Sequence, residues 1–503
     1  MNNKLISGQV HYTVSFFVCA LLLAIPGLHF AGAETPAQRE TLELTPCHLT
    51  TPGFAMRIKA ECGAVQVPEN WADPSGRQIS LHVALIRSNS KKVEPDPVFF
   101  FAGGPGQAAT ESYLPVSHGF MLINQKRDIV LIDQRGTGQS NPLRCPLPKD
   151  FSLLTDMTEE QEKQWLQDCL SSLAGDPTQY TTAAAVRDFD RVRELLGYEQ
   201  INIYGVSYGT RVALTYLRLF PDRIRSIILD GVLPQDISLG PNVAEAAQRA
   251  IDLIFARCQA DPACNKSLPD LPAAFSKIQQ DLRRSPQILE IPHPRSGEPL
   301  QVRFTYDMFA QMVRLLSYSA ETAALLPLLV HNAAQSGDYR ILVSQSVLIG
   351  DNFSTMIYSG LHHCVACAED YPFWSEKPKR DSQNLYLGDL IEHGLTRVCQ
   401  IWPRGDVASD FKQAVTSDVP VLLLSGELDP ITPPAYGEHA AKTLSRSLHI
   451  VVPGHGHNVL SRGCIPKLAT TFIETADVTT LETECVSAIE PMPFFISNAG
   501  PEP

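Results

Sequence analysis

Residues 205–209 form a G-x-S-x-G motif with Ser207 at its centre. The motif follows an apolar, β-rich run, Ile201 to Tyr204, and precedes a helix-like stretch that lasts until Pro221. A tight turn between strand and helix needs glycines, because side chains would clash there, and it exposes the serine hydroxyl above the sheet. About 0.1 chance matches to the bare motif are expected in a chain this long, so its setting carries the specificity. We predict that Ser207 is a nucleophile; a structural glycine turn is the alternative.

A serine hydroxyl needs a base to remove its proton, and that base needs a carboxylate to orient it. Asp429 lies in S-G-E-L-D-P, just past the strand-like run that ends at Leu424. His457 lies in P-G-H-G-H, just past the run that ends at Val452. Enzymes with such a serine turn carry serine, acid and histidine in this chain order. Because catalytic groups gather at the carboxyl ends of parallel strands, we predict a triad of Ser207, Asp429 and His457.

Each of the two later positions has a rival in the same loop. Glu427 could replace Asp429, and His455 could replace His457. Asp429 is preferred because it lies deeper in its loop, directly before Pro430. His457 is preferred because the two glycines ahead of it permit a sharp turn back towards the serine.

The attacked carbonyl oxygen gains negative charge, so backbone N–H donors must be aimed at it. The loop Gly103–Gly106 (G-G-P-G) follows the apolar run Val98 to Ala102 and has no side chain that would block such a donor. We predict that the amides of Gly104 and Tyr208 form this oxyanion hole. The glycine-rich stretch 133–140 lacks the lysine and the spacing of a phosphate-binding P-loop, so no phosphate site is predicted there.

The elements that must hold these groups are short apolar runs separated by helix-like stretches. Such a pattern is typical of buried strands in a mostly parallel sheet with helices on both faces. A helix capped by Thr181 or Thr182 and ended by Gly197 leads into the run before Ser207, which gives an α/β unit. The predicted strands are Ile79–Ile86, Val98–Ala102, Ile129–Ile132, Ile201–Tyr204, Ile224–Leu229, Val419–Leu424 and Leu448–Val452.

Between about Pro234 and Asp418 the strand pattern disappears and helix-like segments take over, for example Val243–Cys258, Leu271–Leu282 and Tyr306–Leu316. We predict an inserted, mainly helical cap over residues 234–418. The sheet-forming core would then comprise residues 34–233 and 419–503.

The N-terminus carries an apolar run, Val14 to Ile25, after Lys4 and before Ala31-Gly32-Ala33. About 12 residues are too few to span a bilayer but fit a signal peptide with A-G-A as its cleavage site. We predict a signal peptide over residues 1–33, cleaved after Ala33; an N-terminal membrane anchor is the alternative. The mature protein is then expected to be secreted or periplasmic, without membrane association.

Cysteine usage agrees with export to an oxidising compartment. Of the 12 cysteines, Cys19 would leave with the signal peptide, and an odd number would remain. The segment His362 to Cys367 (H-H-C-V-A-C) could be a metal or redox site, but the second cysteine pair of a zinc site is absent. We therefore predict neither a metal nor another cofactor. Plausible loop-closing disulfides, whose connectivity the sequence alone does not determine, are Cys47/Cys62, Cys145/Cys169, Cys258/Cys264 and Cys464/Cys485.

These motifs together resemble the prolyl aminopeptidase and tripeptidyl aminopeptidase (TAP-like) branch of the α/β-hydrolases. The resemblance rests on G-G-P-G, D-Q-R-G-x-G-x-S, G-V-S-Y-G, G-E-L-D-P and G-H-G-H, and it covers about Val98 to Val232 and Val419 to Cys485. It implies an α/β-hydrolase fold with an inserted cap. It also implies exopeptidase activity at a free substrate N-terminus, with the triad named above.

The resemblance extends into the cap. It implies a Cys367/Cys399 disulfide, with Cys364 as the odd thiol. One departure is visible, because single-domain prolyl aminopeptidases carry His before G-G-P-G, whereas this chain has Ala102. This departure argues against strict proline specificity and favours the longer, secreted TAP-like group.

An enzyme that cuts near a free N-terminus must bind an ammonium group, and a carboxylate suits that charge. Glu369, Asp370 and Glu111 are the candidates; for each, solvation or pairing with an arginine is the alternative. The chain has 41 Lys+Arg against 54 Asp+Glu, a formal charge of −13, which argues against a nucleic-acid partner. We expect a peptide substrate. A carboxylesterase or lipase with the same triad, and a catalytically silent hydrolase-like binding protein, remain as alternatives.

Overall fold

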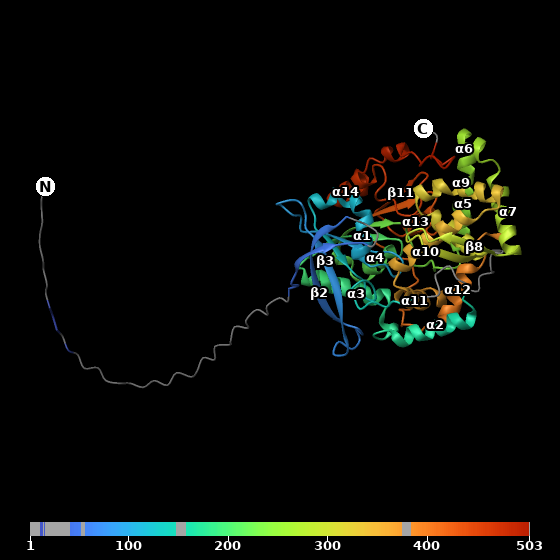
Figure 1. The fold of residues 1–503 in the computed structure, drawn as a ribbon. Helices are drawn as coiled ribbons and strands as arrows, with labels where there is room; N and C mark the ends of the chain where they lie inside the picture. Colours follow the sequence, from blue (N-terminus) through green and yellow to red (C-terminus); the bar gives the residue numbers. More distant parts are fainter. Residues whose placement is uncertain are drawn as a thin grey trace, which may run out of the picture. The chain divides into compact units, whose positions relative to one another are not determined.

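A mostly parallel sheet forms the centre of the protein (Figure 1). The computed structural model describes residues 11–13, 15, 41–51, 56–146, 157–374 and 384–501, so the predicted signal peptide lies largely outside the described residues. Within them the sheet has nine strands in the order β1-β2-β3-β5-β4-β6-β7-β10-β11. The strands are β1 (Thr45–Leu49), β2 (Ile58–Pro68), β3 (Gln78–Ile86), β4 (Val98–Phe101), β5 (Ile129–Ile132), β6 (Ile201–Val206), β7 (Ile224–Asp230), β10 (Val421–Gly426) and β11 (Ser447–Val452).

The strands from β5 to β11 pair in parallel, and β1, β2 and β3 continue the sheet in antiparallel pairs. All residues of β4, β5, β6 and β10 are buried, as continuous apolar runs in a sheet covered on both faces should be. The predicted α/β fold with a mostly parallel sheet is confirmed. The sequence prediction missed β1 and β2, because their half-exposed, polar-rich residues do not form an apolar run.

Helices cover both faces of this sheet. Phe99 and Phe101 of β4 contribute to one apolar cluster together with residues of α3 and α4. Phe100, between them, contributes to a second cluster with residues of α1 and α14. This alternation follows from the two-residue side-chain period of a strand. The helices outside the segment between β7 and β10 are α1 (Ala109–Val116), α2 (Glu159–Ser172), α3 (Thr182–Leu195), α4 (Tyr208–Leu219), α13 (Pro434–Ala441) and α14 (Ile465–Thr475).

The chain between β7 and β10 has an apolar cluster of its own, which includes Phe275, Phe309 and Tyr386. Figure 1 shows α5, α7 and α9 of this segment gathered away from β2 and β3. The segment is mainly helical, but it also holds a hairpin of β8 (Gln287–Pro292) and β9 (Pro299–Phe304), which the sequence prediction missed. Its helices are α5 (Val243–Ala260), α6 (Pro262–Ser267), α7 (Leu271–Arg284), α8 (Tyr306–Leu316), α9 (Ala320–Ser336), α10 (Arg340–Met356), α11 (Ser359–Glu369) and α12 (Leu390–Cys399).

Disulfides link neighbouring segments both in the sheet-forming part of the chain and in the segment between β7 and β10. The pairs are those considered from the sequence and its family resemblance, and Cys364 is a buried free thiol. No helix among the described residues is both long and apolar enough to cross a membrane. The disulfides are Cys47–Cys62, Cys145–Cys169, Cys258–Cys264, Cys367–Cys399 and Cys464–Cys485.

Candidate active site

Ser207 lies in the turn between β6 and α4, with φ 56° and ψ −125°. Two glycines make this turn possible. A Cβ on Gly205 would lie 2.4 Å from the Gly209 carbonyl oxygen, and one on Gly209 would lie 2.1 Å from the Phe101 carbonyl oxygen. The Ser207 amide donates to the Asp230 carbonyl at the end of β7 (2.9 Å). The sharp turn therefore presents the serine at the carboxyl edge of the sheet.

Asp429, in the loop after β10, is fully buried, and its Oδ2 accepts a hydrogen bond from His457 Nδ1 (2.7 Å). Its Oδ1 accepts hydrogen bonds from the amides of Ile431 and Thr432 (both 2.9 Å). The Thr432 hydroxyl donates to Oδ2 (2.8 Å). These donors hold the carboxylate in one orientation towards the imidazole. The sequence prediction missed Thr432, although an aspartate followed three residues later by threonine is a recognisable local turn pattern.

Besides Asp429, His457 contacts Tyr318, in the segment between β7 and β10, and Gly231, just after β7. Burial lowers its pKa, but the charge and hydrogen bond of Asp429 raise it, and the net pKa lies above that of a free histidine. The His457 amide donates to the Tyr318 carbonyl (2.7 Å), and the Tyr318 ring packs edge-on against the imidazole, 5.3 Å between centroids. A Cβ on Gly231 would lie 2.8 Å from His457 Cε1.

The serine and the imidazole thus flank the same strand end. Asp230 accepts the Ser207 amide, and Gly231, the next residue, contacts His457. Among the described residues, the Ser207 hydroxyl has no hydrogen-bond partner. Such contacts are often long in enzymes without substrate and shorten in the substrate complex. We therefore expect the hydrogen bond between Ser207 and His457 in the substrate complex.

The rivals Glu427 and His455 support the turn that carries His457. Glu427 Oε2 accepts from the Gly454 amide (2.8 Å), and His455 Nδ1 contacts the Pro453 carbonyl (2.8 Å). Burial lowers the pKa of His455. The ion pair in this loop region joins Asp429 and His457, and it involves neither Glu427 nor His455.

The G-G-P-G loop runs beside the serine. A Cβ on Gly103 would lie 3.0 Å from the Ser207 Cβ, closer than an ordinary van der Waals contact, so glycine suits this approach. The backbone of Gly104 has φ +107°, a conformation that favours glycine. The amides of Gly104 and Tyr208 donate to no acceptor in the part of the chain that the structure describes. Both predicted oxyanion donors are thus available to a ligand.

Helix α11 contacts this loop from the cap. The Tyr358 amide, just before the helix, donates to the Gly106 carbonyl (2.8 Å). One turn later, His362 Nδ1 lies 3.2 Å from the Pro105 carbonyl. Burial lowers the pKa of His362, so the ring is neutral and donates from Nδ1. Nothing in the sequence spacing relates α11 to the loop, and the sequence prediction missed this contact.

Residues 96–257 match the family described as alpha/beta hydrolase fold, and residues 384–485 match the family described as TAP-like protein. The chain therefore contains an alpha/beta hydrolase domain and a TAP-like domain. It is 25% identical to "Serine protease Hip1" of Mycobacterium tuberculosis over 88% of this chain and 90% of that protein. It is 30% identical to "Tripeptidyl aminopeptidase" of Streptomyces lividans over 34% and 35%. The solved proline iminopeptidase of Mycobacterium smegmatis aligns over 83% and 99% at 14% identity, with a TM-score of 0.37.

Glu369 and Asp370, two of the three candidates for binding a substrate ammonium group, are fully buried at the end of α11. Glu369 accepts hydrogen bonds from the amide and hydroxyl of Thr182 (both 2.6 Å), and burial raises the pKa of Glu369 to about 7. The Thr182 hydroxyl also contacts the Tyr208 hydroxyl (2.6 Å). Asp370 accepts from Arg211 (2.9 Å) and from Lys412 (2.9 Å). Internal donors therefore already use the oxygens of both carboxylates.

Glu111, the third candidate, is half-buried near the start of α1, directly after the G-G-P-G loop. Its Oε1 accepts from the Tyr358 hydroxyl (3.1 Å). Burial raises the pKa of Glu111. Of the three candidates, this carboxylate has the fewest partners and lies beside the oxyanion loop.

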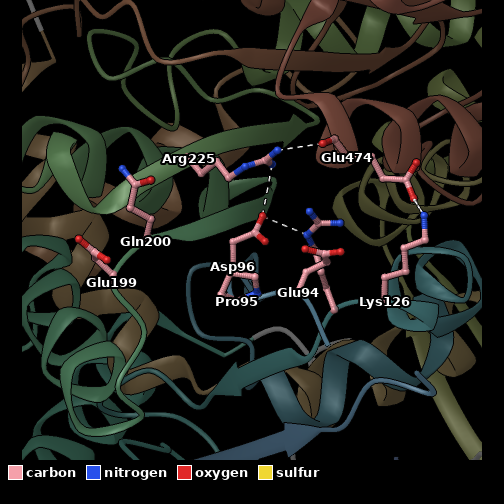
Figure 2. Close-up of a pocket in the computed structure, with 9 residues that line it drawn as sticks. Glu94, Pro95, Asp96, Lys126, Glu199, Gln200, Arg225 and Glu474 are labelled. Carbon is pink, nitrogen blue, oxygen red and sulfur yellow. Dashed lines mark hydrogen bonds and ion pairs between the residues drawn. The ribbon is translucent and has the colours of Figure 1, made fainter. Parts of the chain in front are cut away.

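A cavity of about 520 Å³ lies at the amino ends of the parallel strands, the edge opposite to Ser207 (Figure 2). Asp96, just before β4, pairs there with Arg127 (3.0 Å) and Arg225 (3.3 Å). Lys126 pairs with Glu474. These ion pairs join the segments before β4 and β5 to β7 and α14, and they involve none of the predicted site residues. In the described residues, no group of three or more His, Cys, Asp or Glu side chains could hold a metal ion.

Proposed function

We propose that this hydrolase is an exported serine exopeptidase that cleaves peptides near a free N-terminus. The observation that carries the proposal is the buried Asp429–His457 pair beside the elbow serine. Relatives with peptidase names support the choice of substrate. The disulfides and the predicted signal peptide support export to the periplasm or the medium.

In the proposed reaction, His457 takes the Ser207 proton while Oγ attacks the peptide carbonyl carbon. The amides of Gly104 and Tyr208 donate to the resulting oxyanion. His457 then gives the proton to the leaving amine, the C–N bond breaks, and an acyl-serine remains. Water, deprotonated by His457, attacks the acyl group, and the proton returns to Ser207. Asp429 holds the imidazole orientation and stabilises its charged form throughout.

We assign recognition of the substrate ammonium to Glu111. Glu369 and Asp370 are sealed and already hydrogen-bonded, so an ammonium would have to displace Thr182, or Arg211 and Lys412. Glu111 is half-buried next to the oxyanion loop. Burial raises the pKa of Glu111, and a bound ammonium group would stabilise its charged form.

The first test compares alanine and proline nitroanilides with their N-acetylated forms. We expect the free-amine substrate to be cleaved at least about 100-fold better in kcat/KM, because acetylation removes the charge that Glu111 binds. Glu111→Gln should lower this preference mainly through KM, whereas Glu94→Gln, on the opposite edge of the sheet, should not. Cleavage of a nitrophenyl ester alone would instead indicate an esterase, and no turnover of any substrate would indicate a binding protein.

A second test concerns the contact between α11 and the oxyanion loop. His362→Phe removes the donor to the Pro105 carbonyl and should lower kcat about tenfold with KM little changed, because the loop acts on the transition state. His362→Asn, whose amide can replace Nδ1–H, should recover much of the loss. The matched control is His363→Phe, since neither ring nitrogen of His363 has a hydrogen-bond partner among the described residues and the ring packs on Trp402. Equal losses in both phenylalanine variants would contradict a positioning role.

A further inference from the structure

Arg314, near the end of α8, is a buried cation that has no carboxylate partner among the described residues. Its side chain donates from Nε to Gln311 (3.4 Å) and from Nη1 to the Tyr318 hydroxyl (2.7 Å), both neutral groups. Nη2 makes no hydrogen bond to a described residue, and it is not among the atoms sealed from solvent. The guanidinium therefore keeps one free donor edge.

The other buried arginines of the described chain all differ from Arg314 in this respect. Each forms an ion pair with an aspartate, because a buried charge is costly unless an opposite charge compensates it. Arg314 is 9% exposed and forms no ion pair within the part of the chain that the structure describes. The paired arginines are Arg127 with Asp96, Arg135 with Asp188, Arg193 with Asp190 and Arg211 with Asp370.

Tyr318 connects this cation to the predicted triad. The Arg314 guanidinium lies 5.5 Å from the centroid of the Tyr318 ring, and the same ring packs against His457. Burial and the Asp429 carboxylate are the main influences on the pKa of His457, and Arg314 adds a smaller lowering effect. Arg314 therefore lies within electrostatic reach of the imidazole.

The place of Arg314 also indicates which part of a substrate it would meet. His457 must hand its proton to the leaving amine, so the leaving fragment has to lie against the imidazole. The acyl part lies at the oxyanion loop, where Glu111 is the candidate for the ammonium. Tyr318 packs against His457 and its hydroxyl binds Arg314, so a leaving fragment seated on this ring would come within reach of the guanidinium.

We propose that Arg314 forms a subsite for a carboxylate on the leaving peptide, either its C-terminal carboxylate or an acidic side chain. This inference rests on the proposed exopeptidase function. Arginine suits the role because its planar donors match a carboxylate, and a bound carboxylate supplies the counter-charge that the protein lacks there. The enzyme would then favour short peptides, whose C-terminus lies close to the scissile bond.

The test uses two sets of peptides that begin with the same residue, the one whose nitroanilide is cleaved best. One to three alanines follow this residue. The first set ends in a free carboxylate and the second set in an amide. A third set combines the amide with one glutamate in place of alanine. At one peptide length, we expect the native enzyme to cleave the peptide with the free carboxylate with a kcat/KM about tenfold higher than that of the matching amide. The length series locates a C-terminal carboxylate, and the glutamate set locates a side-chain carboxylate.

Arg314→Gln should bring the ratio of kcat/KM for the carboxylate peptide to kcat/KM for the amide peptide close to one, mainly through KM. Arg314→Lys should keep part of the preference for the carboxylate. The control is Arg283→Gln, since Arg283 also lies over a tyrosine ring, Tyr306, and donates to its hydroxyl (2.8 Å), without touching the triad. It should leave the ratio unchanged. If Arg314→Gln does not fold, inhibition of native nitroanilide cleavage by Ala-Ala and by Ala-Ala-amide replaces it, and Ala-Ala should bind about tenfold tighter.

Three results would overturn the proposal in distinguishable ways. Peptide cleavage without any preference for carboxylate, or equal inhibition by the two dipeptides, contradicts the anion subsite and leaves the exopeptidase function intact. A preference that survives in Arg314→Gln assigns the recognition to another residue. A native enzyme that cleaves no peptide or nitroanilide contradicts the proposed function, and the subsite with it.

Discussion

Ser207→Ala should lower kcat for the best free-amine nitroanilide by about 10⁵-fold or more, with little effect on thermal unfolding. In the proposed reaction this hydroxyl forms the acyl intermediate, and the other groups of the triad have nothing to activate once it is gone. The substitution removes one oxygen that has no hydrogen-bond partner among the described residues, so the fold loses little. Steady-state kinetics together with a melting curve would measure both quantities.

The matched control is Ser425→Ala. Ser425 lies near the end of β10 and is hydrogen-bonded to His449 Nε2 (2.9 Å), so the protein contains a second serine and histidine pair. That serine lies within a strand and has no elbow, so it cannot be approached by a substrate carbonyl. We expect Ser425→Ala to keep activity within a few-fold. A fluorophosphonate probe should label the native enzyme and Ser425→Ala but not Ser207→Ala; the reverse pattern would make Ser425 the nucleophile.

The candidate triad could be predicted because each member follows a short apolar run in the sequence. Ser207 comes directly after β6, and Asp429 and His457 lie in the loops that follow β10 and β11. Parallel strands bring such positions to one edge of the sheet. Local glycines in the first and last motifs then mark the turns. The preference for Asp429 over Glu427 rested on loop depth, and in the structure Asp429 is the residue paired with His457.

The contacts made by the cap could not be predicted in the same way. Tyr318 and Arg314 approach His457 from more than 100 residues away, and α11 approaches the G-G-P-G loop from still further along the chain. No local pattern marks such a contact, because it depends on how the cap packs on the core. The exposed strands β1 and β2 were missed for a different reason: their residues are apolar only at alternate or irregular positions.

Asp429→Asn should lower kcat by about 10⁴-fold and also move the pH profile. The asparagine Oδ1 can accept the amides that Asp429 accepts, but its NH₂ group would then face His457 Nδ1 and force the wrong tautomer. The general base works only when neutral, so activity rises as pH rises through the pKa of His457. Asp429 holds that pKa above the value of free histidine. The acid limb of the native profile should therefore lie above about pH 6.5.

Without the carboxylate, burial dominates, and the acid limb of the residual Asp429→Asn activity should move to lower pH. Glu427→Gln is the matched control, because Glu427 lies in the same loop and its carboxylate holds the Gly454 amide instead of the imidazole. It should leave the acid limb in place and keep most of kcat. Profiles of kcat/KM between about pH 5 and 9 test both variants. If the acid limb of the pH profile stayed in place in Asp429→Asn and moved in Glu427→Gln, Glu427 would be the acid of the triad.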